Sequence, residues 1–182
     1  MSQRHSDEDP LLDAARECIL AVGVRRTTLT DVARRAGVSR MTLYRRYPDL
    51  EAVLSALMTR EFGRLIAPAE GETTRERVVA MVVGGCRALA ADPLFVRLLD
   101  VDPELLLPYM TQRLGGVQRI AVAAGAEALA VDDGSVRRDA PPKVLSAGIE
   151  LIARGFVLAS HGELEVDPWA ELARAVDGYL RP

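Results

Sequence analysis

The sequence predicts an all-α protein. Apolar residues recur at helical spacing along nearly the whole chain, and no stretch combines sustained alternation of apolar and polar residues with β-branched enrichment. At 182 residues the chain is long enough to bury roughly two-thirds of its unfolded surface. These observations indicate a helical protein with a sizeable core.

Composition excludes several other classes of protein. With 49% hydrophobic and 27% charged residues the chain is typical of globular domains rather than of disordered or fibrous ones. No apolar run reaches the roughly 18 residues of a membrane span, and the first ten residues lack the apolar segment of a secretory signal, so we expect a cytoplasmic protein. Cys18 and Cys86 match no metal-ligand spacing and His5 and His161 lie in polar segments, so we expect neither a metal nor a cofactor.

The first helix is predicted to begin at Asp9-Pro10, where an acceptor side chain precedes a proline at the first helical position. Gly23 is expected to end it. Its predicted apolar face consists of Leu11, Ala15, Cys18, Ile19 and Val22.

Two short helices follow. Thr28 and Asp31 resemble a capping box, with Asp in place of Glu, and open a second helix that stops at Gly37. Ser39 then caps a third helix, which Pro48 ends because proline disfavours helical geometry in the residue before it.

A fourth helix is predicted from near Asp49 to about Phe62. Proline and glycine then mark a linker around residues 65–73. The sequence therefore predicts two domains, residues 9–64 and residues 73–182.

The second domain is also predicted to be helical throughout. Its apolar spacing indicates helices around Val78 to Leu89, Pro93 to Leu99, Pro103 to about Ala128, Lys143 to Ser160 and from Asp167-Pro168 to the end, with a loop at Asp132 to Pro142. The helix from Lys143 to Ser160 is apolar nearly all round, so it must be covered on two sides. In a domain this small, the second cover is expected to be another subunit.

The sign of the net charge changes near the same domain boundary. Residues 1–64 carry a net charge of +2 and residues 65–182 carry −5. Between residues 16 and 48, eight arginines face only Glu17 and Asp31, which gives a local charge of +6. A cluster of this kind is suited to phosphates, although a solvated arginine-rich face is the alternative.

Residues 28–47 have the spacing of a helix-turn-helix motif. Ala33 and Ala36 are small enough for two helices to approach closely, and Gly37 accommodates the turn between them. In such a motif the second helix enters the major groove of DNA. The residues expected to contact bases are Arg40, Met41, Thr42 and Arg45, and those expected near phosphates are Thr28, Ser39, Tyr44, Arg46 and Tyr47.

The same segment resembles the N-terminal domain of TetR-family transcriptional regulators. The resemblance rests on Thr28, Val32, Ala33, Ala36, Gly37, Val38, Ser39, Leu43, Tyr44 and Tyr47 and extends over roughly residues 9–62. The chain departs from the family pattern at Met41, where a small residue is common, and at Leu50, where a lysine usually contacts a phosphate. The second departure puts that one contact in doubt.

The resemblance implies a function for both domains. It implies a homodimeric repressor that binds a palindromic operator and is released by a small molecule held in the C-terminal domain, with double-stranded DNA, a second copy and an effector as partners. Because the chain has few aromatic residues, we expect an apolar effector in a largely aliphatic pocket. The candidate pocket residues are Met81, Cys86, Phe95, Tyr109, Met110 and Phe156, and the candidate dimer residues are Ala147, Leu151, Gly155, Leu158, Trp169 and Val176.

Two other functions compete with this one. An enzyme is disfavoured because the sequence has no paired Cys and His, no G-x-S-x-G motif and no P-loop. The alternative that stays open is a helix-turn-helix dimer that acts mainly through a protein partner.

Overall fold

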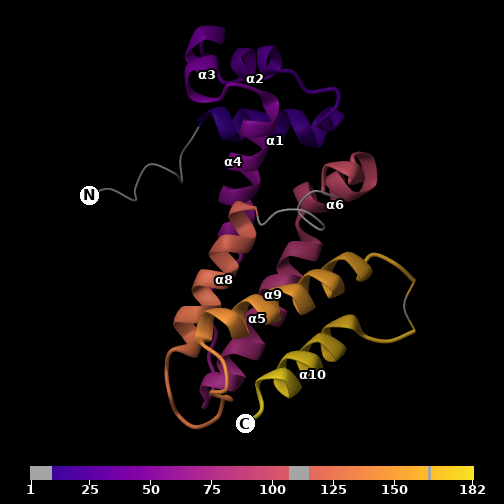
Figure 1. Ribbon diagram of the computed structural model, residues 1–182. Helices are drawn as coiled ribbons and strands as arrows, with labels where there is room; N and C mark the ends of the chain where they lie inside the picture. Colours follow the sequence, from indigo (N-terminus) through magenta and orange to yellow (C-terminus); the bar gives the residue numbers. More distant parts are fainter. Residues whose placement is uncertain (1–9, 107–114, 164) are drawn as a thin grey trace. The chain divides into compact units, whose positions relative to one another are not determined.

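The computed structural model describes residues 10–106, 115–163 and 165–182. The helices in these ranges are α1 (Pro10–Val22), α2 (Leu29–Arg35), α3 (Arg40–Arg46), α4 (Leu50–Gly63), α5 (Thr74–Ala91), α6 (Pro93–Val101), the 3-10 helix η1 (Pro103–Leu105), α8 (Gly116–Leu129), α9 (Pro142–Ala159) and α10 (Pro168–Leu180) (Figure 1). No strand occurs in the described ranges, and the prediction of an all-α fold is confirmed.

Within the described residues, no single helix is long and apolar enough to cross a membrane. Helices α5 and α6 together have the length and composition of a membrane span, but they are bent by 60° at the break between them.

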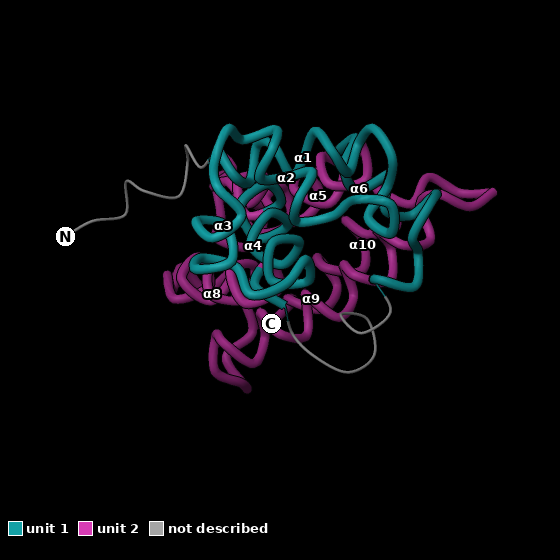
Figure 2. Tube along the Cα trace, turned by 90° about the horizontal axis from the view of Figure 1, so that it is seen from above, with its two compact units in different colours: residues 1–62, 92–116 teal, residues 63–91, 117–182 magenta. Residues whose placement is uncertain are grey.

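The described chain packs as two compact units that differ from the expected domains. The first unit joins the residues up to Phe62 with those from Asp92 to Gly116, and the second unit joins residues 63–91 with residues 117–182 (Figure 2). Helix α6 therefore lies with the first unit, although the division at residue 73 had assigned it to the second domain. The reason is packing, because the ring of Phe95 in α6 meets the ring of Phe62 edge-on at 5.7 Å.

The boundaries of the first four helices agree with the sequence. Helix α1 starts at Pro10, and Gly23 follows its end with a φ of +83°. The capping box of α2 is present in full, because Thr28 accepts from the Asp31 amide and the Asp31 carboxylate accepts from the Thr28 amide. One residue differs from the expected apolar face of α1, since Val22 is 40% exposed.

The core of the first unit is drawn from all its N-terminal helices. Ile19 of α1, Val32 of α2, Leu43 of α3 and Leu57 of α4 are completely buried. These side chains hold α2 and α3 on α1 and α4, as the helical spacing of apolar residues predicts.

The second unit is built around the contacts of α5, α9 and α10. Its core contains Val78, Leu129, Val136, Leu145, Ile149, Leu172, Val176 and Leu180. Helices α9 and α10 approach closely at Gly148, where a Cβ would overlap the Tyr179 hydroxyl. Helix α8 meets α9 at Gly125, beside Ser146, whose hydroxyl donates to the Val122 carbonyl at 2.9 Å.

The single helix predicted from Pro103 to about Ala128 is wrong. Residues Pro103–Leu105 form a 3-10 helix, Gly115 is non-helical and α8 begins at Gly116. The buried Asp102 before Pro103 and the glycine pair at 115–116 interrupt a pattern whose apolar spacing alone suggested one helix.

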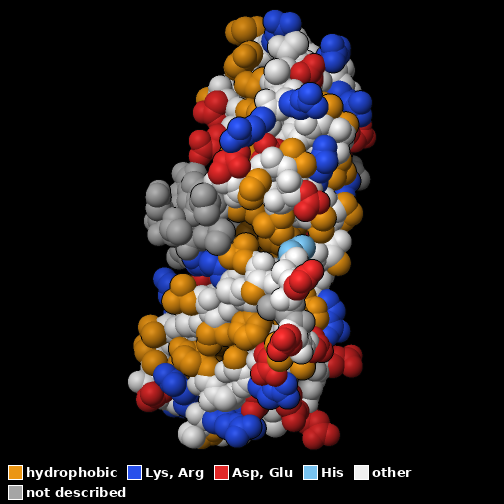
Figure 3. All heavy atoms as spheres, turned by 90° about the vertical axis from the view of Figure 1, so that its right-hand side faces the viewer, with side chains coloured by type: hydrophobic (Ala, Val, Ile, Leu, Met, Phe, Trp, Pro, Cys, Tyr) orange, Lys and Arg blue, Asp and Glu red, His pale blue; other side chains and the backbone are white. Residues whose placement is uncertain are grey.

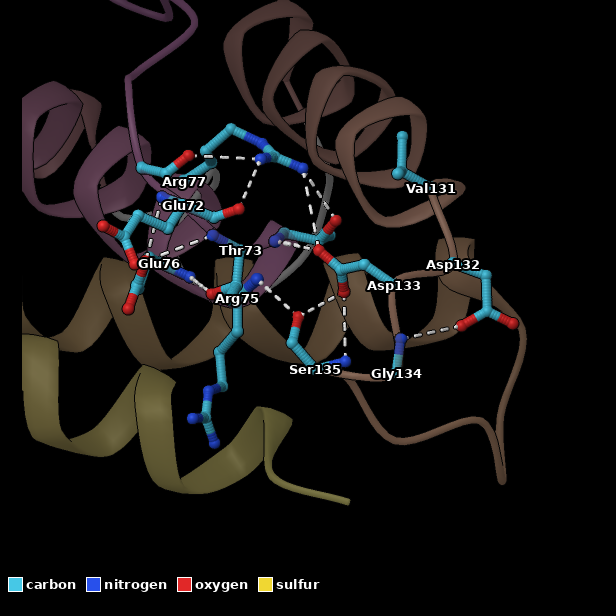
Figure 4. Close-up of polar contacts among 12 residues, drawn as sticks. Glu72, Thr73, Arg75, Glu76, Arg77, Val131, Asp132, Asp133, Gly134 and Ser135 are labelled. Carbon is cyan, nitrogen blue, oxygen red and sulfur yellow. Dashed lines mark hydrogen bonds and ion pairs between the residues drawn. The ribbon is translucent and has the colours of Figure 1, made fainter.

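The N-terminus of α5 is capped by a distant loop. Asp133 accepts a hydrogen bond from the Thr74 amide at 2.6 Å, and the Ser135 hydroxyl accepts from the Arg75 amide at 3.1 Å. The other carboxylate oxygen of Asp133 accepts from the hydroxyl and amide of Ser135, so the loop and the helix form one network (Figure 4). These bonds satisfy helix amides that otherwise lack partners.

This network predicts a loss of stability in acid. The Ser135 hydroxyl and the Thr74 and Ser135 amides hold the pKa of Asp133 well below its ordinary value. A carboxyl group with a lowered folded-state pKa stabilises the fold above its unfolded-state pKa, and that stability is lost as the pH falls toward the folded-state pKa. We expect Asp133→Asn to lower the melting temperature at about pH 7 and to differ less from wild type near about pH 3. A constant difference across that range would contradict the prediction.

Candidate nucleic-acid interface

The turn between α2 and α3 brings the two helices together as the motif requires. The Val38 amide donates to the Ala33 carbonyl at 3.0 Å, and Gly37 has a φ of +69°, a left-handed conformation that glycine adopts without strain. Val32 and Leu43 are completely buried beneath the turn. The outer face of α3 is thereby left exposed.

Helix α3 begins with a capped N-terminus. The Ser39 hydroxyl accepts from the Thr42 amide at 3.1 Å and lies 2.9 Å from the Thr42 hydroxyl. Thr42 is half-buried. Its hydroxyl is engaged with the cap, so the methyl group is the part of the side chain that suits an apolar contact with a base.

Four predicted contact residues lie on the exposed surface of α3. Met41 is 77% exposed and Tyr44 is 48% exposed, so Tyr44 is not a core aromatic residue. Arg40 and Arg45 are exposed as well. These four side chains are therefore accessible to a partner.

The two remaining aromatic and basic residues of the motif lie together at the end of α3. The Arg46 guanidinium lies 5.7 Å from the centre of the Tyr47 ring. Tyr47 is half-buried, whereas Arg46 is exposed. This cation–π contact holds the guanidinium beside the ring.

Ion pairs within the described residues neutralise several arginines of the cluster. The paired arginines are Arg16 with Glu61 at 3.6 Å, Arg25 with Glu104, Arg34 with Asp31 at 2.8 Å, and Arg35 with Glu17 at 2.6 Å. Arg26, Arg40 and Arg45 have no ion-pair partner within the ranges that the structure describes. Figure 3 shows Lys and Arg side chains gathered at its upper end, where Figure 1 places α2 and α3. The available positive charge therefore belongs mainly to α3.

The sequence did not indicate which arginines form ion pairs within the chain, and Arg26 was not among the predicted contact residues. Arg35 and its partner Glu17 are 18 residues apart, and Arg25 and Glu104 are 79 residues apart. No local pattern indicates such pairs. Arg26 lies just before Thr28, exposed and on the same turn, and so extends the unpaired positive charge toward the start of α2.

The predicted phosphate contacts at the helix starts occupy suitable positions. Thr28 is exposed at the start of α2, and its hydroxyl donates to Asp31 at 2.5 Å, which lowers the pKa of Asp31. Leu50 is the first residue of α4 and is half-buried, while Asp49 accepts from the Ala52 amide at 2.7 Å. Leu50 thus stands where a longer, charged side chain would reach outward from the helix start.

The candidate effector residues do not all come together. Cys86 and Phe156 are half-buried against the core of the second unit, and Met81 is half-buried on α5. Phe95 is buried in the first unit. Tyr109 and Met110 lie outside the described residues.

Of the two cysteines, Cys18 is buried and Cys86 is half-buried. Both are free, and burial raises the pKa of Cys18 and raises that of Cys86 to about 12. In the described ranges no group of three or more His, Cys, Asp and Glu side chains could hold a metal ion.

The candidate dimer residues divide between the two C-terminal helices. On α9 the predicted residues share an outward face with Val144, which is 55% exposed: Leu151 is 64% exposed, Gly155 is exposed, and Ala147 and Leu158 are half-buried. We call these five residues the α9 face.

The two candidates on α10 differ in burial. Val176 is completely buried in the core of the second unit, so the expectation that it faces a partner is corrected, whereas Trp169 is half-buried against the same core and its contact with a partner stays a prediction. The outer side of α10 carries ion pairs instead, Arg174 with Glu171 and Arg181 with Asp177. The inward stripe of α10 is apolar because it covers its own unit.

The chain resembles known proteins both in its N-terminal helices and over most of its length. A family model described as bacterial regulatory proteins, tetR family, matches residues 11–57. An uncharacterized HTH-type transcriptional regulator of Mycobacterium bovis is 34% identical over 178 residues, which cover 93% of this chain and 92% of the relative. The HTH-type transcriptional regulator AlkX of Mycobacterium tuberculosis is 30% identical over 179 residues, which cover 94% and 83%.

Among solved structures, the transcriptional repressor QsdR of R. erythropolis, from the TetR family, has a TM-score of 0.74. Its sequence identity is 20%, and the match covers 93% of this chain and 92% of that one. At this identity the likeness shows the fold.

Proposed function

The chain belongs to the TetR family of bacterial regulatory proteins, which are DNA-binding transcriptional regulators rather than enzymes, and we propose that it is a cytoplasmic repressor that binds a palindromic operator as a homodimer. The observation that carries this proposal is the exposed face of α3. It presents Arg40 and Arg45, which have no ion-pair partner among the described residues, on the second helix of a helix-turn-helix motif.

The geometry supports distinct roles for the residues of this face. The N-terminal part of a recognition helix meets base edges in the major groove, and this part holds Arg40, Met41 and Thr42. An arginine can donate two hydrogen bonds to guanine, and methyl or thioether groups suit the thymine methyl. Arg45 follows one turn on as the further base contact, whereas Tyr44 and Arg46 suit contacts to phosphates, which position the helix on the duplex.

We propose that a second copy of the chain packs on the α9 face. The face combines two large apolar side chains that are more than half exposed with small residues that permit close approach. A two-fold dimer through α9 makes the patch complementary to itself. Such a dimer would place two α3 helices on two half-sites of a palindrome, one DNA turn or a multiple apart.

The proposed effector is a small apolar molecule held within the second unit. Its core cluster is aliphatic, and Cys86 and Phe156 add polarizable and aromatic surface beside it. Ligand binding that favours one arrangement of the dimer would shift the population away from the operator-binding state. The effector would thereby relieve repression.

The proposal is tested by selecting random duplex DNA on the purified protein and then measuring binding of the enriched sequence across a salt series. An enriched inverted repeat whose affinity falls steeply with salt supports the proposed repressor. No enrichment at any salt concentration would overturn it and favour a motif that acts through a protein partner.

Base readout by Arg40 gives a specific prediction. Replacing Arg40 with alanine is expected to cost about 1–3 kcal/mol of operator affinity and to relax the preference at one base pair. Binding of variant operators by the mutant measures both effects.

Arg34→Ala is the matched control. It also removes one exposed arginine, but that arginine is paired with Asp31 on α2. We expect its effect to be small and uniform across sequences. An equal loss on every sequence with Arg40→Ala would refute base readout by Arg40.

A further inference from the structure

A buried carboxylate holds the turn between α1 and α2. Asp102 lies at the end of α6, is 1% exposed, and accepts a hydrogen bond from the Val24 amide at 2.7 Å. The two residues are 78 positions apart in the sequence and belong to the same compact unit. Asp102 thereby fixes the backbone just after α1.

Further hydrogen bonds connect this anchor to the start of α2. The Thr27 amide donates to the Val24 carbonyl at 3.0 Å, and the buried Thr27 hydroxyl donates to the Gly23 carbonyl at 2.7 Å. The next residue, Thr28, is the N-cap of α2. Val24 and Thr27 are 6% and 4% exposed, so water does not readily replace these bonds.

The turn is also packed tightly against the end of α6. A Cβ on Gly23 would lie 2.9 Å from the Val101 Cγ1 and 3.1 Å from the Asp102 Oδ2. Only glycine fits this approach, since its φ of +83° also disfavours other residues. The position of the turn is therefore determined by α6 as well as by α1.

The carboxylate of Asp102 is poorly compensated for so buried a group. Its Oδ1 lies 3.6 Å from the Arg25 Nε and has no hydrogen bond in the part of the chain that the structure describes. Arg25 is instead hydrogen-bonded to Glu104 at 2.6 Å. Burying a charge of this kind is costly, and an apolar residue would avoid the cost. What Asp102 supplies that an apolar residue cannot is an acceptor for the Val24 amide.

We propose that Asp102 is a positioning residue for DNA binding. By anchoring the turn at residues 23–28, it sets where Arg26 and the capped N-terminus of α2 lie relative to α3. Phosphate contacts from α2 and base contacts from α3 can form together only in one register. This inference rests on the proposed function, because it assigns Asp102 a role in operator binding.

The test compares three variants on the selected operator and on a scrambled duplex, at a temperature where circular dichroism shows each to be folded. Asp102→Ala removes the acceptor, Asp102→Asn keeps an amide oxygen at the same place, and Glu104→Gln makes the same change of charge two residues away. Electrostatics alone predicts tighter DNA binding by all three, because each loses a negative charge.

If Asp102 positions the turn, the operator affinities of the three variants follow a different order. We expect Asp102→Ala to bind the operator at least about tenfold more weakly and to lose selectivity over the scrambled duplex. We expect Asp102→Asn to restore most of the affinity, and Glu104→Gln to bind as tightly as wild type or slightly more so. Should Asp102→Ala fail to fold, Thr27→Val removes another bond of the same turn without changing its shape. It is expected to weaken operator binding several-fold.

Hydrogen exchange of the Val24 amide distinguishes loss of its hydrogen bond to Asp102 from loss of operator binding. The amide should be protected in wild type and in Asp102→Asn and should exchange faster in Asp102→Ala. If protection is lost while operator affinity and selectivity are unchanged, Asp102 does not position the motif and the inference is overturned. If wild type itself selects no DNA sequence, the proposed function fails, whereas the Val24 amide still reports whether the anchor exists.

Discussion

Leu151→Asp is expected to convert the protein into a folded monomer and to weaken operator binding by about a hundredfold or more. Leu151 is the most exposed residue of the α9 face, at 64%. A carboxylate there remains solvated in the monomer but would be buried beside its own symmetry mate in a two-fold dimer. Loss of the dimer removes the gain that comes from binding two half-sites at once.

Sedimentation velocity measures the first effect, and operator binding at fixed salt measures the second. Ala123→Asp on the exposed side of α8 adds the same charge elsewhere in the second unit and serves as the control. We expect it to remain dimeric and to bind the operator. A Leu151→Asp protein that still sediments as a dimer would show that α9 is not the interface.

Ile152→Asp, one residue further along α9, is expected to unfold the second unit instead. Ile152 packs against the core cluster of Leu145, Ile149 and their neighbours. A carboxylate there has to enter an apolar environment without a partner, so we expect the free energy of unfolding to fall by about 3 kcal/mol or more. Urea denaturation followed by circular dichroism measures the loss.

The control at this position is Ile152→Val, which removes one methyl group and should cost about 1 kcal/mol. Together the two positions test the orientation of α9. If Ile152→Asp remained as stable as wild type while Leu151→Asp unfolded, the helix would present its opposite side to the core.

The helix-turn-helix motif was predictable because its determinants are local. Thr28 and Asp31 cap a helix three residues apart, and Gly37 occupies a left-handed turn conformation between two short helices. The apolar residues that close the motif, Val32 and Leu43, follow from helical spacing. Membership of the family was expected on the same residues and is confirmed by the relatives that span most of the chain.

The orientation of the C-terminal helices was not predictable in the same way. Both α9 and α10 carry apolar residues on several sides, and a spacing pattern does not say which apolar stripe meets the chain's own core. The structure places Val176 inside and Leu151 outside. It also assigns α6 to the first unit, because the contact of Phe95 with Phe62 joins residues 33 positions apart that no local pattern connects.

The sequence by itself determined the helical fold, the boundaries of the first four helices and the residues presented by α3, because caps, turns and helical periodicity act over a few neighbouring residues. Only the tertiary structure decided which arginines remain unpaired and which carboxylate anchors the turn before α2. Those outcomes depend on partners such as Glu104 and Asp102, which lie 79 and 78 residues from Arg25 and Val24. Folding brings them together through packing of α6 on α1, and charge and hydrogen bonding then act over ångströms rather than along the chain.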